Sequence, residues 1–160
     1  MKTFTEKQKF TQWWLWLILF GLLSIPICGL FLQFIMDKPF GDNPTSDGGL
    51  MLFALFMLLF LGFFYSITLK TEIDEQGIRM IFFPFVHKSI PWEKVENAEI
   101  VTYSIFIGWG IRLFTPYGTA YNIKGNKGLA LTLKEGTKLM IGTQKAVELQ
   151  AFIKGINLTN

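Results

Sequence analysis

The chain is poor in the residues that most often build metal and redox sites. Its 160 residues include one cysteine, Cys28, and one histidine, His87. A single cysteine excludes an internal disulfide. One cysteine with one histidine also excludes a metal site built from several Cys and His ligands. We therefore expect no metal and no cofactor.

Charged residues are scarce as well. They make up 17% of the chain, against about 25% in an average soluble domain, whereas hydrophobic residues make up 51%. Arginine occurs only at Arg79 and Arg112, and no recognition motif for nucleic acid is present. We therefore expect no nucleic-acid partner.

The apolar residues gather in two uncharged runs, residues 13–36 and 50–69. Each run is long enough to cross a bilayer core of about 30 Å as a helix. One alternative is a pair of buried core helices, but neither run has the polar stripe of a soluble helix. The other is a signal peptide, but the first run is too long and no small-residue cleavage pattern follows it. The runs predict a transmembrane helical hairpin.

Basic residues flank these runs unequally. Three lysines lie in the tail 1–12, one lies in the connector 37–49, and three basic residues follow the second run, at positions 70, 79 and 88. Lysine and arginine are enriched on the cytoplasmic side of membrane proteins. This distribution predicts that both termini are cytoplasmic and that the connector is an external loop.

Residues 70–160 have a different pattern. Short stretches rich in β-branched and aromatic residues alternate with turn signals, which favours a mainly antiparallel sheet of seven or eight strands. The expected strands are 69–74, 78–83, 86–90, 99–106, 111–114, 119–123, 129–134 and 138–141. We expect this segment to fold without the helices, because it can bury a core of its own.

A single helix is expected to follow the strands. Thr143 is placed to cap a helix over 144–154, and Gly155 is placed to end it. The apolar residues of this helix lie on one side at helical spacing, at Leu149, Phe152, Ile153 and Ile156.

The order and spacing of several short segments point to a family. These segments are Ile90–Val95, Gly108–Arg112, Thr119–Ile123, Gly125–Gly128 and Ile141–Gln144. With the terminal helix and the two preceding membrane helices, they resemble the bacterial pleckstrin-homology-like (PH-like) domain over about residues 69–156. The resemblance implies an α+β membrane protein of the bacterial inner membrane. Its cytoplasmic PH-like β-barrel or sandwich would carry one C-terminal helix and serve as a binding or assembly module rather than an enzyme.

One feature departs from the eukaryotic members of that family. Those that bind phosphoinositides usually carry basic residues on the first hairpin, whereas residues 70–79 of this chain are mainly acidic. This departure argues against an inositol-phosphate site of the eukaryotic kind.

Few residues offer catalytic chemistry. His87 has no recognisable nucleophile motif near it, and a catalytic histidine needs such a partner. Three glutamates at positions 93, 96 and 99 fit solvated charge better than a carboxylate pair. Gly108-Trp109-Gly110 lacks the third glycine of a dinucleotide loop, because Leu113 stands at that position. We expect no catalytic residues.

Two sets of residues are candidates for binding. Trp109 and Arg112 are candidate partner-binding residues, because tryptophan and arginine are favoured interface anchors; the alternative is simple packing. Residues 113–160 hold six lysines against two glutamates, a net charge of +4. Five of these lysines are candidate lipid-facing residues, with an ordinary solvated face as the alternative: Lys124, Lys127, Lys134, Lys138 and Lys145.

The leading hypothesis is a membrane-tethered, non-enzymatic scaffold that binds a protein partner or a second copy of itself. The alternative is recognition of anionic lipid head groups by the lysine-rich half of the domain.

Overall fold

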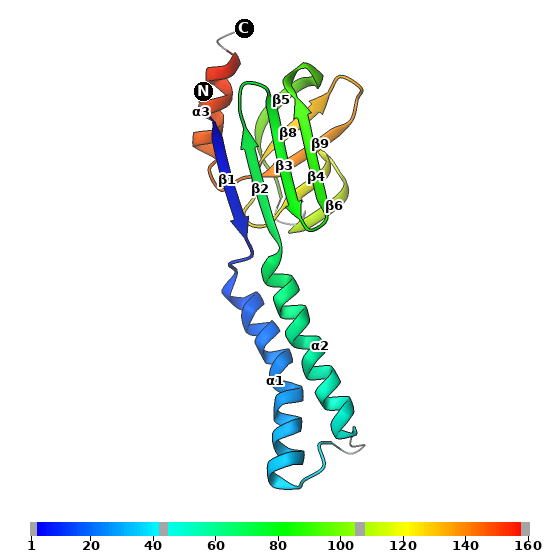
Figure 1. Ribbon diagram of the computed structural model, residues 1–160. Coiled ribbons are helices and arrows are strands. Elements are labelled where there is room, and N and C mark those ends of the chain that lie inside the picture. Colours follow the sequence, from blue (N-terminus) through cyan, green and yellow to red (C-terminus); the bar gives the residue numbers. More distant parts are fainter. Residues whose placement is uncertain (1–2, 42–44, 105–107, 158–160) are drawn as a thin grey trace. The chain divides into compact units, whose positions relative to one another are not determined.

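The computed structural model describes residues 3–41, 45–104 and 108–157. In these residues the chain is an α+β protein with two apolar N-terminal helices, two mainly antiparallel sheets and a C-terminal helix (Figure 1). The chain divides into two compact units. Residues 11–66 form the helical unit, and the segments on either side of it together form the β unit.

The helical unit is a pair of helices, α1 (Trp13–Met36) and α2 (Asp47–Ser66). The start of α1 lies beside the end of α2, because the Trp16 ring packs edge-on against Phe64 and Tyr65 with centroids 6.1 Å apart. A small cluster of buried residues joins the two helices further along, at Leu19, Leu23, Met57 and Leu61.

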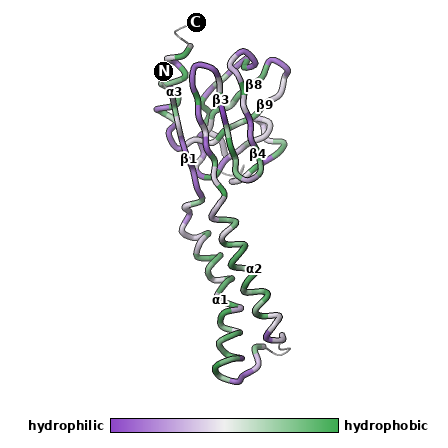
Figure 2. The backbone as a smooth tube through the Cα atoms, in the orientation of Figure 1, coloured by the Kyte–Doolittle hydropathy of each residue, from purple (hydrophilic) through white to green (hydrophobic). Residues whose placement is uncertain are grey.

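Most of the other large apolar side chains of these helices are exposed. Figure 2 shows that both helices are hydrophobic along most of their length. In the part of the chain that the structure describes, these helices are therefore not buried core helices, which was the alternative to a transmembrane hairpin. Both helices are long and apolar enough to cross a membrane.

The second helix differs from its predicted bounds. It begins at Asp47 and ends at Ser66, whereas the sequence predicted a span over 50–69. The apolar run continues past the helix into a strand, where Leu69 is fully buried in the β unit. An uncharged run does not mark this boundary, because a buried strand and a membrane helix are equally apolar.

The first sheet has four antiparallel strands in the order β1-β2-β3-β4. They are β1 (Phe4–Lys9), β2 (Thr68–Ile73), β3 (Gly77–Phe83) and β4 (Val86–Pro91). The strand β1 comes from the segment that the sequence analysis treated as a tail. It pairs with β2 along its whole length, from Phe4 opposite Ile73 to Lys9 opposite Thr68.

The inward side chains of β1 explain why the pattern did not predict this strand. Phe4, Glu6 and Gln8 face inward and are buried, while Thr5 and Lys7 are exposed. Two of the three inward residues are polar, so the alternation of apolar and polar residues that marks a half-buried strand is missing.

The second sheet has five strands in the order β5-β8-β9-β7-β6. They are β5 (Val95–Thr102), β6 (Gly110–Thr115), β7 (Gly118–Asn122), β8 (Lys127–Leu133) and β9 (Lys138–Gly142). A short 3-10 helix, η1 (Trp92–Lys94), leads into this sheet. All neighbouring strands are antiparallel except β7 and β9, which are parallel.

The two sheets share one core. Side chains from β2 and β3, such as Leu69 and Ile78, are fully buried together with Leu131 and Ile141 from β8 and β9. The rings of Phe82 on β3 and Tyr121 on β7 lie 6.5 Å apart across the interface. The strands after the helices bury this core together with Phe4 of β1, which lies before the helices.

The C-terminal helix α3 (Ala146–Asn157) contacts β5 and β8. Its predicted apolar side is confirmed, because Leu149 and Ile153 are buried and Phe152 and Ile156 are half-buried. The Phe152 ring lies 6.2 Å from that of Phe4 on β1. The predicted bounds are wrong at both ends, because the helix begins at Ala146 rather than at 144, directly after Thr143, and continues through Gly155.

Candidate interaction surface

The bend that carries Trp109 is built from glycines. Gly108 and Gly110 adopt φ values of +74° and +93°, a region that side chains with a Cβ rarely enter. Trp109 is half-buried between them. The amide of buried Asn122 holds the bend in place, donating hydrogen bonds to the carbonyls of Gly108 and Gly125 at 3.4 and 3.2 Å.

Arg112 reaches back to the same bend from β6. A Cβ placed on Gly108 would lie 3.1 Å from Arg112 Nη2, so the guanidinium lies directly over this glycine. The Arg112 side chain is otherwise exposed. The structure therefore places the Arg112 guanidinium over Gly108, the glycine that precedes Trp109.

The next two residues were not predicted to belong to this surface. Leu113 is 62% exposed and Phe114 is 98% exposed. Phe114 also has a φ of +59°, in the left-handed region that is strained for an aromatic residue. It lies where the pairing of β6 with β7 is irregular, between Arg112 and Thr115. We call Trp109, Arg112, Leu113 and Phe114 the β6 surface.

One signal in the sequence could have shown that at least one of these two residues is exposed. Successive side chains of a strand point to opposite faces, so Leu113 and Phe114 cannot both enter the core. The left-handed backbone at Phe114, by contrast, lies at the irregular pairing of β6 with β7 and has no sequence signature of its own.

Side-chain hydrogen bonds and packing support the hairpin that presents the β6 surface. The Thr115 hydroxyl donates to the Gly118 carbonyl at 2.7 Å and accepts the Tyr117 N–H at 3.2 Å. Tyr117 packs on a cluster that contains buried Tyr103. Burial raises the pKa of Tyr103 to about 12, so its hydroxyl stays protonated and donates to the Gly125 carbonyl at 3.4 Å.

β6 is also an edge strand. In the described part of the chain its only hydrogen-bonded neighbour is β7. An edge strand can pair with an added strand of a binding partner, so main-chain groups lie beside the exposed side chains.

The five candidate lysines are exposed but fall into two groups. Lys127 begins β8, and Lys124 and Lys145 lie at the same end of that strand, where Thr143 N–H donates to the Lys127 carbonyl. Lys134 and Lys138 flank the turn at the other end. A seven-residue strand separates the two groups by about 20 Å.

Lys145 is moreover engaged within the chain. Its ammonium lies 3.3 Å from a Glu148 carboxylate oxygen and 5.9 Å from the centroid of the Phe4 ring. The five lysines therefore do not form one continuous basic face.

The remaining candidates lie apart from one another. His87 is exposed on β4, opposite Ile81, and the three glutamates at positions 93, 96 and 99 are exposed along η1 and β5. Among the residues that the structure describes, no group of three or more His, Cys, Asp or Glu side chains is arranged to hold a metal ion.

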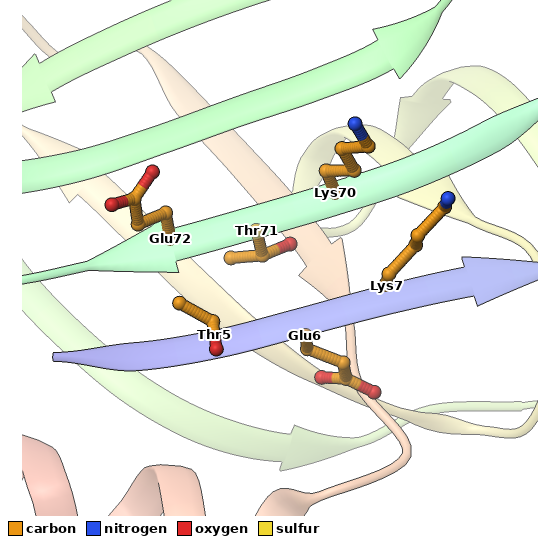
Figure 3. A pocket seen from close by; sticks show the side chains of 6 residues that line it. All are labelled: Thr5, Glu6, Lys7, Lys70, Thr71 and Glu72. Carbon is orange, nitrogen blue, oxygen red and sulfur yellow. The ribbon is translucent and has the colours of Figure 1, made fainter.

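A shallow pocket of about 220 Å³ lies on β1 and β2 (Figure 3). Lys7 and Lys70 face each other directly across the two strands, and their side chains extend to the same side. Like charges in this position repel each other. This lysine pair was not predicted from the sequence, because its two members come from segments more than sixty residues apart.

No protein-family model matches the chain, and no curated protein sequence matches it significantly. The PH-like assignment therefore stays a prediction that comes from the order of strands, turns and terminal helix.

Proposed function

We propose that this chain is a membrane-anchored, non-enzymatic interaction module with a PH-like β unit. In this proposal α1 and α2 cross the bacterial inner membrane and both termini are cytoplasmic. The β unit binds a protein partner or a second copy of the chain through the β6 surface. Two mainly antiparallel sheets followed by one amphipathic helix support the PH-like assignment.

The outer surfaces of the two helices support the membrane anchor. Most of their large apolar side chains are exposed, which would be costly in water and is favourable in lipid. Aromatic residues lie at the ends of the helices that join the β unit, at Trp13, Trp14 and Tyr65. Tryptophan and tyrosine prefer the membrane–water interface.

The observation that carries the binding role is Phe114. A fully exposed aromatic side chain contributes almost nothing to the core, and its left-handed backbone costs on the order of 1–2 kcal/mol. Strained residues of this kind cluster at functional sites. Leu113 adds exposed apolar surface beside it, and Trp109 and Arg112 add the side chains that most often anchor interfaces.

The division of the lysines favours partner binding over the alternative of lipid recognition. A head-group site needs several cations that converge on one anion or one membrane face. The two groups of lysines lie at opposite ends of β8, and one of the five already pairs with Glu148.

Phe114→Gly tests the binding role without damaging the fold. Glycine accepts a φ of +59° without strain, so the unfolding temperature should stay at or above that of the wild type. Loss of the ring should remove a central contact of the partner and reduce its capture by about tenfold or more. The measurement is affinity purification from membranes, with bound proteins, including untagged copies of the chain, quantified by mass spectrometry.

Val147→Ala is the matched control, because Val147 is an apolar residue of α3 that is 80% exposed. It should capture the same partners as the wild type. Equal capture by wild type, control and Phe114→Gly would contradict the binding role of the β6 surface.

A further inference from the structure

The turn between β3 and β4 is unusual for an exposed turn. It reads Phe83-Pro84-Phe85, and the Phe85 N–H closes it by donating to the Phe82 carbonyl at 2.7 Å. Phe83 is 46% exposed and Phe85 is 54% exposed. Turns in water are usually built from Gly, Asn, Asp, Ser and Pro. Here the whole segment Met80–Val86 has no charged residue.

Strand register places this turn beside the point where the chain leaves α2. Phe83 pairs with Thr68, and Thr68 is only two residues beyond Ser66, the last residue of α2. Two residues of chain and one cross-strand step span at most about 13 Å. Whatever angle the helices take to the sheet, the Cα of Phe83, the first residue of the turn, stays within that distance of the Cα of Ser66.

Charge along the first sheet changes sign with distance from the helices. Lys9 is opposite Thr68, and Lys7 is opposite Lys70, so three lysines lie within two residues of the Thr68 level. The far end carries Glu72, Asp74 and Glu75 around the turn into β3.

Two of these acidic residues, Glu72 and Asp74, form ion pairs within the β unit. Arg79 pairs with Glu72 and Asp74 at 3.3 and 2.5 Å. Burial alone would raise the pKa of Asp74, but the N–H groups of Gln76 and Gly77 and the charge of Arg79 outweigh it and lower the pKa. Asp74 therefore stays ionised at neutral pH.

We propose that the Phe83–Phe85 turn enters the interface of the bilayer that α1 and α2 span, with Lys7, Lys9 and Lys70 facing its anionic head groups. Apolar side chains flanked by lysine are the arrangement that binds such an interface. The negative end of the sheet then points away from the membrane. This contact gives the β unit a fixed orientation on the membrane, and it rests on the membrane anchor of the proposed function.

The test measures the depth of single labels in the full-length protein. All variants carry Cys28→Ser, which removes the native cysteine. Each variant has one new cysteine that bears an environment-sensitive fluorophore. The three positions are exposed in the structure: Phe85→Cys in the turn, Val147→Cys on the outer side of α3, and Leu59→Cys on the outer side of α2. The proteins are reconstituted in vesicles of phosphatidylcholine and phosphatidylglycerol. Quenching by aqueous iodide is compared with quenching by lipids that carry a nitroxide near the head group or deep in the acyl chain.

We expect the label at position 85 to be quenched much less by iodide than the label at position 147, and to be quenched by the nitroxide near the head group. The label at 147 should respond to iodide alone, and the label at 59 to the deep nitroxide. If position 85 behaves like 147 while 59 stays in lipid, the turn is not in the interface and only this inference fails. If iodide also quenches position 59, the helices do not span the bilayer, and the anchor and the inference fail together.

Discussion

The buried carboxylate of Glu6 on β1 connects the N-terminal strand with the segment between β9 and α3 near the C-terminus. Its side chain is 8% exposed, and its two oxygens accept hydrogen bonds from the Thr143 hydroxyl at 2.6 Å and the Gln144 N–H at 2.7 Å. Beside it, the Gln8 amide donates to the Gly142 carbonyl at 2.7 Å. The inward face of β1 therefore satisfies the polar groups between β9 and α3, where an apolar side chain would leave them unpaired.

Glu6→Ala should lower the free energy of unfolding by about 1–3 kcal/mol, because the Thr143 hydroxyl and the Gln144 N–H lose their acceptor in a buried place. Glu6→Gln should cost less, since the amide keeps one acceptor oxygen. Thermal unfolding of the full chain in detergent, followed by the sheet signal in circular dichroism, measures both. Thr5→Ala on the exposed side of β1 is the control. An unfolding temperature of Glu6→Ala equal to that control would show that these hydrogen bonds do not stabilise the fold.

At the scale of elements, the two helices are an insertion between neighbouring strands. β1 ends at Lys9 and β2 begins at Thr68, and these two residues are register partners in an antiparallel pair. A short hairpin turn would suffice to connect them. The chain instead places α1 and α2 in this connection. The strand before the helices, β1, and the strand after them, β2, therefore belong to the same sheet.

This topology predicts a soluble domain. Replacing residues 10–67 by Asn-Gly, which favours a two-residue hairpin, should give a folded β-rich protein without the helices. The fragment 67–160 lacks β1 and leaves Thr143 and Gln144 without their acceptor, so it should be less stable by about 2 kcal/mol or more. Urea unfolding of the two proteins measures the difference. Equal urea midpoints would mean that β1 is dispensable.

The sequence predicted the elements with a clear apolar pattern. The helical pair forms two uniformly apolar runs, whereas the buried side of α3 places apolar residues at helical spacing. The strand predicted over 99–106 was wrong in its bounds, because β5 begins at Val95 and ends at Thr102; the last two predicted residues lie outside the described part of the chain. β1 was missed because Glu6 and Gln8 face polar main-chain groups that come together only in the folded chain.

The candidate surfaces, like the secondary-structure elements, were predicted only in part from the sequence. Trp109 and Arg112 were singled out by residue type, and the structure places the Arg112 guanidinium over Gly108, next to Trp109 in the chain. Leu113 and Phe114 were missed because their exposure depends on the irregular pairing of β6. Counting lysines gave the net charge of the second half, but only strand register shows that they lie at opposite ends of β8.

For the molecule as a whole, the proposals depend on one arrangement. In the proposed arrangement the helices cross the membrane, the connector between them faces outward, and the β unit lies in the cytoplasm. This arrangement presents the β6 surface to cytoplasmic proteins and the Phe83–Phe85 turn to the inner leaflet. The excess of lysine and arginine beside the β unit, compared with one lysine in the connector, supports this orientation.

Labelling of single cysteines with a membrane-impermeant maleimide tests that arrangement most directly. In a Cys28→Ser background, Thr45→Cys reports on the connector and Val147→Cys on the β unit, since both positions are exposed. In intact spheroplasts we expect Thr45→Cys to be labelled and Val147→Cys to be labelled only after the membrane is permeabilised. Labelling of Val147→Cys in intact spheroplasts, with Thr45→Cys protected, would contradict the account.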